Sequence, residues 1–473
     1  MKKIKTDVCV IGAGSGGLSV ASGAVQMGAK VVLIEAGEMG GDCLNYGCVP
    51  SKALLSAAKQ AHVIREGGAG IAGVTPQVDY AAAMDHVQSA IATIAPHDSQ
   101  ERFEGLGCTV IRAHARFISP RTVQAGDTEI TARRFVIATG SRAFIPPIDG
   151  LKNTPFLTNE TLWAQRSAPK HLLILGGGPI GMEMAQAHRR LGSDVTVVDA
   201  GKALGRDDPE AAEVVKATLR NEGVSIIEDA PVIRVSGGAG DIQLHLKDGQ
   251  TLSGTDLLVA VGRVANTDSL DAEKARIDLT SKGVKVDAAL RSSNRRVYAI
   301  GDAAGGMQFT HVAGYHAGVL IRALLFGLPA KAASHHIPRA TYTDPELAQI
   351  GMTESEAREA HGNALTVTRA EISGNDRAIA TGRSAGGGFI KVMIVKKRPV
   401  GVTIVGPDAG ELISFWALVA ASGLKMGQIA GMVAPYPTLM EVNKRAAGAY
   451  FTPKLFESPR VKTVVKLVQR FLP

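Results

Sequence analysis

The feature that most constrains this chain is a glycine-rich turn that occurs twice, each time after a short apolar run. The first copy, GAGSGG, begins at Gly12 after residues 7–11, and the second, GGGPIG, begins at Gly176 after HLLIL. In both copies the next segment predicts a helix, and a second apolar run then ends in an acidic residue, Glu35 or Asp199. Each acid lies 18 residues past the last glycine of its copy, since 35 − 17 and 199 − 181 are equal. This order of strand, glycine turn, helix, strand and acid is typical of a dinucleotide-binding fold.

Each glycine of the motif has its own physical reason. Gly12 permits the tight turn, Gly14 lets the backbone approach a pyrophosphate, and Gly17 allows close packing of the helix on the strand. The corresponding residues of the second copy are Gly176, Gly178 and Gly181. The helix N-terminus offers free N–H groups to phosphates, and the acid accepts hydrogen bonds from ribose hydroxyls. One such motif is weak evidence, but two with equal spacing predict a chain that binds two dinucleotides.

Composition excludes several other classes of protein. A length of 473 residues suggests roughly three domains. The formal charge of +8 is a mild excess, and basic residues interleaved with aromatics are not evident, so we expect no nucleic-acid partner. The start, MKKIKTDVCVIG, lacks the apolar core of a signal peptide. The longest apolar stretch, residues 412–424, is too short to span a bilayer. These features predict a cytoplasmic protein.

Two of the four cysteines, Cys43 and Cys48, lie within the segment GGDCLNYGCVPSK at residues 40–52. A structural disulfide is typical of small, cysteine-dense secreted domains, and a zinc site needs further clustered ligands. We therefore favour a redox dithiol and expect no metal site. Thiols that exchange electrons with a nicotinamide need an intermediate electron carrier, and a flavin can serve as one. The first fold is accordingly predicted to hold FAD and the second NAD(P)H. Cys9 and Cys108 lie in apolar stretches and are expected to be inert core thiols.

With both folds and the cysteine segment considered, the chain resembles the flavin-dependent pyridine nucleotide–disulfide oxidoreductases. That family includes dihydrolipoamide dehydrogenase, glutathione reductase and mercuric reductase, and the resemblance spans roughly residues 5–455. Further matches are Ala138-Thr139-Gly140, the segment VYAIGDAA with Asp302, and Gly262-Arg263 with Asn266. The resemblance implies an α/β fold with two Rossmann-like dinucleotide-binding domains plus a C-terminal α+β dimerisation domain, and an obligate homodimer.

The resemblance also implies roles for individual residues. Cys43 would be the interchange thiol that attacks the substrate, and Cys48 would lie against the flavin as the charge-transfer thiolate. Lys52 and Glu183 match a Lys–Glu pair that flanks the flavin, and Asp302 would contact its ribityl chain. The residues implied to bind the two cofactors are Gly12, Gly14, Gly17, Glu35, Gly41, Lys52, Ala138, Thr139, Gly140 and Asp302 for FAD, and Gly176, Gly178, Gly181, Asp199, Gly262 and Arg263 for the nicotinamide domain.

One position departs from the family pattern. Dithiol members usually place a histidine five residues before a C-terminal glutamate, as the acid/base for the interchange thiol, and here Tyr436 precedes Glu441 instead. Histidine titrates near neutral pH, whereas tyrosine, with a pKa near 10, is a poor base but a usable acid. By resemblance, Tyr436 and Glu441 would act on the partner's cysteines. A packing role for Tyr436 is the alternative interpretation.

The leading hypothesis is an NADH-dependent flavoenzyme that passes electrons through Cys43 and Cys48 to a small disulfide, as dihydrolipoamide dehydrogenase does. Tyr436 resembles a tyrosine of the mercuric reductases, so a metal or another thiophilic acceptor is the enzyme alternative. The non-enzyme alternative is a flavin-binding partner subunit without turnover. Asp199 favours NADH because a carboxylate repels a 2′-phosphate, while the nearby Lys202 and Arg206 leave NADPH open.

The predicted domain boundaries follow from these segments. Residues 1–150 and 266–334 would form a discontinuous FAD-binding domain, residues 151–265 the NAD(P)-binding domain, and residues 335–473 the dimerisation domain.

The tail at residues 458–473 predicts a short basic amphipathic helix. Its apolar positions are Val461, Val464, Val465, Val468 and Phe471 or Leu472, and its cations are Arg460, Lys462, Lys466 and Arg470. Two interpretations stay open, docking on the protein's own surface and peripheral contact with an anionic membrane.

Overall fold

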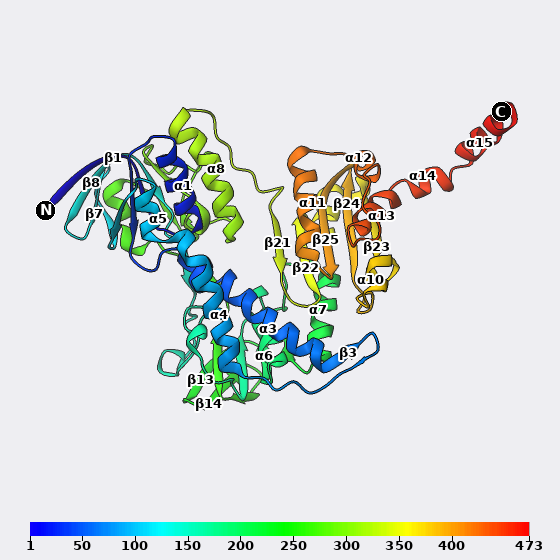
Figure 1. Ribbon diagram of the computed structural model, residues 1–473, viewed down its shortest axis with the longest axis horizontal. Helices are drawn as coiled ribbons and strands as arrows, with labels where there is room; N and C mark the ends of the chain where they lie inside the picture. Colours follow the sequence, from blue (N-terminus) through cyan, green and yellow to red (C-terminus); the bar gives the residue numbers. More distant parts are fainter. Residues whose placement is uncertain (473) are drawn as a thin grey trace.

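The computed structural model describes residues 1–472 and is organised around a seven-stranded, a four-stranded and a five-stranded sheet, with helices between and around them (Figure 1). The first sheet has the order β5-β2-β1-β8-β7-β6, and β20 also pairs with β8. Its central strands are β1 (Lys2–Ile11), β2 (Val31–Glu35) and β8 (Thr128–Ile137), all parallel. Strand β20 (Val297–Ala299) joins the same sheet, so chain segments on both sides of the second glycine motif build it together.

Strand β1 is longer than the apolar run at residues 7–11 predicts. It begins at Lys2 because residues 2–6 pair with β8, where their side chains are largely exposed. The outer strands of this sheet are β5 (Thr109–Arg112), β6 (Ala115–Ser119) and β7 (Thr122–Ala125).

The helices that follow the first glycine motif lie where the sequence predicts them. Helix α1 (Ser15–Gln26) follows the turn and contacts α8 (Thr310–Phe326). The short helix α2 (Gly41–Asn45) and the longer α3 (Cys48–Glu66) contain the cysteine segment. Pro50 lies in the first turn of α3, where its missing N–H has no intrahelical partner to lose.

The second glycine motif lies in the four-stranded parallel sheet, whose order is β12-β11-β10-β16. Helix α6 (Pro179–Arg190) follows the turn after β10 and packs with α3 and α4 (Tyr80–Ile94) in one apolar core. The strands of this region are β10 (His171–Leu175), β11 (Asp194–Val198), β12 (Ser225–Ile227) and β16 (Asp256–Val259), with a separate sheet of β13 (Val232–Gly238), β14 (Asp241–Leu246) and β15 (Thr251–Gly254).

The third sheet is antiparallel, as the change of pattern after residue 337 indicates, and has the order β21-β22-β25-β24-β23. Its strands are β21 (Pro338–Thr341), β22 (Glu346–Gly351), β23 (Leu365–Glu371), β24 (Phe389–Val395) and β25 (Arg398–Gly406). The helices packed with this sheet are α9 (Glu354–His361), α11 (Ala409–Ser422), α12 (Met426–Ala430) and α13 (Glu441–Ala449). Trp416 is buried in α11 and donates a hydrogen bond to Asn443 of α13 at 2.9 Å.

A row of polar side chains crosses the third sheet at one level. Its members are neighbours in register, namely Arg339, Gln349, Thr403, Lys391 and Arg369. The row faces the N-terminus of α7 (Pro209–Asn221), which follows the second motif's acid. Lys391 lies 3.1 Å from Asp208 and 2.9 Å from Glu210. Buried charges of opposite sign thus join this sheet to the second glycine fold.

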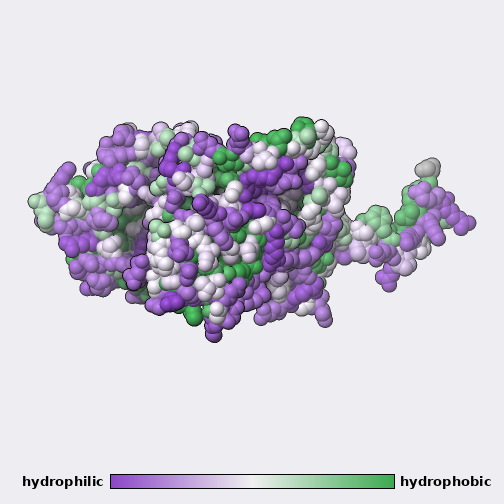
Figure 2. Space-filling model, turned by 90° about the horizontal axis from the view of Figure 1, so that it is seen from below, coloured by the Kyte–Doolittle hydropathy of each residue, from purple (hydrophilic) through white to green (hydrophobic). Residues whose placement is uncertain are grey.

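The tail forms the predicted helix but does not pack on the rest of the chain. Helix α14 (Thr452–Phe456) is followed by α15 (Pro459–Phe471), which projects from the body in Figures 1 and 2. No residue of α15 is buried. Residues 458–472 therefore do not dock on the chain's own surface. Ser458 caps a new helix, and that helix leads away from the body. Within residues 1–472 no helix is long and apolar enough to cross a bilayer.

Candidate active site

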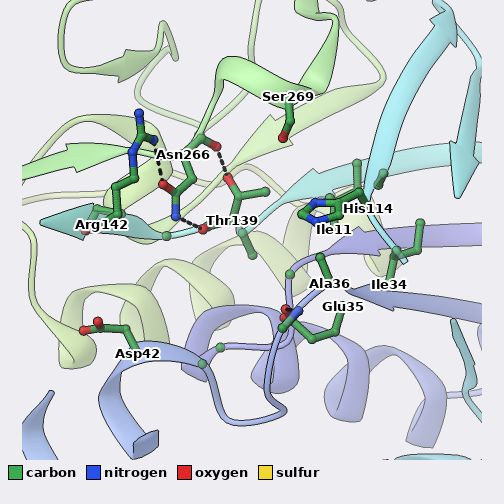
Figure 3. Close-up of a pocket in the computed structure, with 18 of the residues that line it drawn as sticks. Ile11, Ile34, Glu35, Ala36, Asp42, His114, Thr139, Arg142, Asn266 and Ser269 are labelled. Carbon is green, nitrogen blue, oxygen red and sulfur yellow. Dashed lines mark hydrogen bonds between the residues drawn. The ribbon is translucent and has the colours of Figure 1, made fainter. Parts of the chain in front are cut away.

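The first glycine motif borders a cavity of about 460 Å³ at the ends of β1, β2 and β8 (Figure 3). Thr139 and Asn266 lie side by side on its wall: the Thr139 hydroxyl donates to the Asn266 backbone carbonyl at 2.6 Å, and the Asn266 side-chain amide donates to the Thr139 carbonyl at 3.0 Å. Arg142 donates to the Asn266 side chain at 2.9 Å. The Ala138-Thr139-Gly140 strip is thereby held against the segment that follows β17 (Arg263–Ala265).

The glycines of this motif have the surroundings that a bound dinucleotide needs. A Cβ at Gly12 would overlap the Ala138 carbonyl, and one at Gly17 would overlap the Gly12 carbonyl. Gly14 has room on its cavity side, where its nearest neighbour is the Gly41 Cα at 3.9 Å from a built Cβ. Glu35 also lines the cavity. This cradle fits FAD. Gly12 and Gly17 pack tightly against neighbouring backbone, while the backbone at Gly14 stays accessible from the cavity, as a pyrophosphate requires.

The second motif repeats the same arrangement. A Cβ at Gly176 or Gly181 would overlap backbone carbonyls, whereas Gly178 faces open space. In both copies the acid accepts from the N–H just after the first glycine, Ala13 to Glu35 at 2.6 Å and Gly177 to Asp199 at 2.7 Å. The shared contact shows that the two cradles are built alike, which fits two dinucleotides.

The cations near Asp199 differ in their surroundings. Lys202 forms an ion pair with Asp229, so one of the two cations that could attract a 2′-phosphate is already engaged. Arg206 is exposed. Asp199 itself accepts a second backbone hydrogen bond, from Gly201 at 2.8 Å, which holds its carboxylate in place.

Cys43 in α2 and Cys48, the first residue of α3, are both free thiols that hydrogen-bond to each other. That hydrogen bond, together with the Thr310 hydroxyl at 3.3 Å and the charge of Lys52, lowers the pKa of Cys48 to about 6 against the effect of burial. The hydrogen bond and burial raise the pKa of Cys43. The surroundings therefore favour Cys48 as the member of the pair that carries negative charge. Location at a helix N-terminus favours the Cys48 thiolate further.

Lys52 and Glu183 meet although they come from different helices. The Lys52 Nζ lies 2.7 Å from a carboxylate oxygen of Glu183, which is the fifth residue of α6 and whose side chain is only 5% exposed. The other Glu183 oxygen accepts from the backbone N–H of Tyr342 at 2.9 Å.

Asp302 belongs to a series of hydrogen-bonded side chains that the sequence does not indicate. Ser141 donates to Asp302 at 2.5 Å, and the Arg263 Nε donates to Ser141 at 2.7 Å. Arg263 also lies 3.0 Å from Asp42, beside Cys43. Burial raises the pKa of Asp302. Arg263, which follows Gly262 at the end of the predicted nicotinamide domain, thus contacts the cysteine helix. The residues that sequence reasoning missed are Asp42, Ser141 and Thr310.

Tyr436 and Glu441 lie in the third-sheet region. Tyr436 is 72% exposed and its hydroxyl donates to Asp376 at 3.1 Å. Glu441 begins α13, and one of its carboxylate oxygens is buried without a hydrogen-bond partner among residues 1–472. Within the described chain no hydrogen bond joins either residue to Cys43 or Cys48.

The chain is similar to known proteins over nearly its whole length. A family model described as "Pyridine nucleotide-disulphide oxidoreductase" matches residues 6–317, and one for the dimerisation domain of the same family matches residues 337–447. These matches, with the three sheets, confirm the predicted fold class.

Individual relatives cover nearly all of the chain. It is 34% identical over 463 residues to the mercuric reductase of Shigella flexneri, covering 94% of this chain and 80% of that protein. It is 31% identical over 458 residues to the dihydrolipoyl dehydrogenase of Geobacillus stearothermophilus, covering 94% and 96%. The structure of the HOCl-induced flavoprotein disulfide reductase RclA from Escherichia coli is similar with a TM-score of 0.83 at 28% identity, covering 93% and 99%.

Proposed function

The chain belongs to the pyridine nucleotide-disulphide oxidoreductase family, and from this membership we propose that it passes electrons from NADH through Cys43 and Cys48 to a small disulfide. It is a flavoprotein oxidoreductase that uses FAD and NAD(P)H, and it forms a homodimer through its dimerisation domain. One observation carries the proposal. Cys43 and Cys48 are two free thiols around the start of α3, where the Thr310 hydroxyl, 3.3 Å from Cys48, and the charge of Lys52 both lower the pKa of Cys48.

The two cradles divide the work of binding. Gly12, Gly14 and Glu35 would hold one end of FAD. Thr139 and Asp302 would contact the rest of the cofactor. When bound, FAD supplies two-electron transfer between the nicotinamide and the disulfide. Lys52 and Thr310 stabilise negative charge at Cys48, through the ammonium and the hydroxyl respectively. The predicted domain boundaries, with the nicotinamide domain at 151–265, are part of this proposal.

The thiol steps balance as an exchange. The sulfur of Cys43, after losing its proton, attacks one sulfur of the acceptor disulfide and forms a mixed disulfide, expelling a thiolate that takes up a proton. The Cys48 thiolate then attacks the Cys43 sulfur, which releases the second thiol and closes the Cys43–Cys48 disulfide. Tyr436 and Glu441 of the partner would face this exchange in the homodimer.

NADH is the proposed donor. The Asp199 carboxylate is held by two backbone N–H groups, and in this position it would repel a 2′-phosphate. Lys202, the first of the two cations along the chain, is paired with Asp229.

A metal or other thiophilic acceptor is the second candidate function. Tyr436 in place of histidine favours it, because the exchange of a thiol proton at neutral pH then lacks its usual base. The mercuric reductases among the relatives support the same candidate.

The initial rate of NADH oxidation with lipoamide as acceptor tests the function, with NADPH as the comparison donor. A rate on the order of 10 per second or more is expected of a working disulfide reductase, and the NADH rate is expected to exceed the NADPH rate. A negligible rate with flavin that NADH still reduces would favour the thiophilic acceptor. Flavin that stays oxidised in NADH would contradict both and leave the partner-subunit alternative.

We further propose that α15 contacts an anionic membrane surface. Its apolar side chains are exposed, with Val464 at 56% and Phe471 at 72%, and the helix has no acidic residue. An amphipathic helix with cations beside an apolar face is suited to such an interface.

Deletion of residues 458–473 is expected to abolish sedimentation of the protein with phosphatidylserine-containing liposomes. Neutral liposomes serve as the control and should bind little of either form. The double variant Lys462→Glu/Lys466→Glu keeps the apolar face and is expected to weaken binding strongly. Intact protein that stays unbound at low salt would rule the contact out.

A further inference from the structure

Tyr342 links the third sheet to the redox pair of the same chain. It directly follows β21, the strand that reaches over toward α3 and α6 in Figure 1. The Lys52 Nζ lies 4.6 Å from the centroid of the Tyr342 ring. The same ammonium is 2.7 Å from Glu183, and Glu183 accepts from the Tyr342 backbone N–H. One residue therefore contacts both members of the Lys52–Glu183 pair, the cation with its ring and the anion with its backbone.

The ring is held in place from behind. A Cβ at Gly410, near the start of α11, would approach the Tyr342 ring to 3.0 Å, so the glycine lets the ring pack closely against this helix. Gly410 is fixed in turn by its N–H, which donates to Glu346 at 2.8 Å. The backbone contact with Glu183 would survive a substitution of Tyr342, whereas the ring contact would not. The two contributions can therefore be separated.

A lysine ammonium needs such a restraint because it ends a flexible four-carbon chain. The Lys52 side chain is 37% exposed, so it is not held by close packing on all sides. A cation over an aromatic face is attracted by the ring quadrupole, and that attraction is directional. The Tyr342 ring therefore restricts where the Lys52 ammonium can lie, and that ammonium is the positive charge that acts on Cys48. The charged, titratable and polar groups that face Cys48 are Cys43 and Asp42 from α2, Lys52 from α3, Thr310 from α8, and Tyr342.

We propose that Tyr342 is a positioning residue, which holds the Lys52 ammonium by a cation–π contact so that the dimerisation domain tunes the redox pair of its own chain. This rests on the proposed redox function of Cys43 and Cys48. It adds a contribution in cis to the one that Tyr436 and Glu441 would make to the partner.

The test compares Tyr342→Leu with Tyr342→Phe in the FAD-loaded homodimer after two-electron reduction. The Cys48 thiolate is titrated by its charge-transfer absorbance with the bound flavin, and the reduction potential of the dithiol pair is measured. In Tyr342→Leu the thiolate-to-thiol ratio near the midpoint is expected to fall about threefold, so the midpoint moves to higher pH. The potential is expected to become more negative, because the reduced pair loses stability. Tyr342→Phe keeps the ring and is expected to match the wild type.

Two further variants serve as controls. Lys52→Met removes the charge and is expected to shift the midpoint further than Tyr342→Leu. Tyr342→Met gives the same comparison without a ring if the leucine variant does not fold. Equal shifts in Tyr342→Phe and Tyr342→Leu would overturn the proposal by assigning the effect to the hydroxyl. A midpoint that moves in Lys52→Met but in neither ringless variant would overturn it as well. A wild-type protein whose reduced pair shows no thiolate at any pH would overturn the proposed function too.

Discussion

Replacing Cys43 by serine is expected to lower turnover with a disulfide acceptor by at least about 10³-fold, while NADH continues to reduce the flavin. The sulfur of Cys43 forms the bond to the acceptor in the proposed exchange, and a serine hydroxyl cannot form it. The flavin cradle does not include the Cys43 side chain, so the reductive half of the reaction remains. Stopped-flow reduction by NADH and steady-state turnover with lipoamide separate the two halves.

Cys108→Ser is the matched control, because it also exchanges one thiol for a hydroxyl. Burial raises the pKa of Cys108 to about 11, so this thiol takes no part in exchange at neutral pH. Its variant is expected to keep the wild-type rate. Unchanged turnover in Cys43→Ser would mean that electrons leave the protein without passing through the cysteine pair.

Replacing Tyr436 by histidine is expected to raise turnover with lipoamide by about 10²-fold at pH 7 to 8. The hydrogen bond to Asp376 raises the pKa of Tyr436, which makes it an even poorer base than an ordinary tyrosine. A histidine is neutral above pH 6.5 and can then accept the thiol proton, so the gain should grow as the pH rises through that value. The unpartnered buried oxygen of Glu441 is available to orient it. Tyr436 is largely exposed, so the substitution is expected to cost little stability.

Two further variants define what the gain means. Glu441→Gln in the histidine background should remove most of it, since the amide orients imidazole without stabilising its protonated form. Tyr436→Phe separates the remaining interpretations: a drop in turnover would show that the hydroxyl acts as an acid, and no change would show a packing role. If the histidine variant is no faster than the wild type, proton transfer at this position does not limit the rate.

Sequence reasoning was most successful where the physical cause is local. The spacing of Gly12, Gly14 and Gly17 specifies which backbone atoms touch, and the same spacing recurs around Gly176, so both cradles follow from the pattern. The helix after Cys48 likewise follows from a short stretch of chain. Thr310 could not be found in this way, because it meets Cys48 across 262 residues of chain. Its position depends on how α8 packs, which no local pattern encodes.

The same limit applies to the charged groups. The resemblance pairs Lys52 with Glu183, but nothing in the sequence indicates that Tyr342 covers that pair or that Arg263 reaches Asp42. The contacts of such aromatic and guanidinium groups become known only when the packing of the sheets against one another is known. The tail shows the converse case, since its amphipathic pattern predicts a helix correctly and is silent on what that helix contacts.

The polar row on the third sheet links the stability of two parts of the chain that are far apart in sequence. Lys391 anchors Asp208, which closes the loop that begins at Asp199, and the sheet that carries Lys391 belongs to the dimerisation domain. The loop that ends at Asp208 and the third sheet therefore share one set of ion pairs. Because the side chains of Lys391 and Asp208 are both buried, removing either charge would leave the other without its counter-ion, so the loop and the sheet would lose stability together.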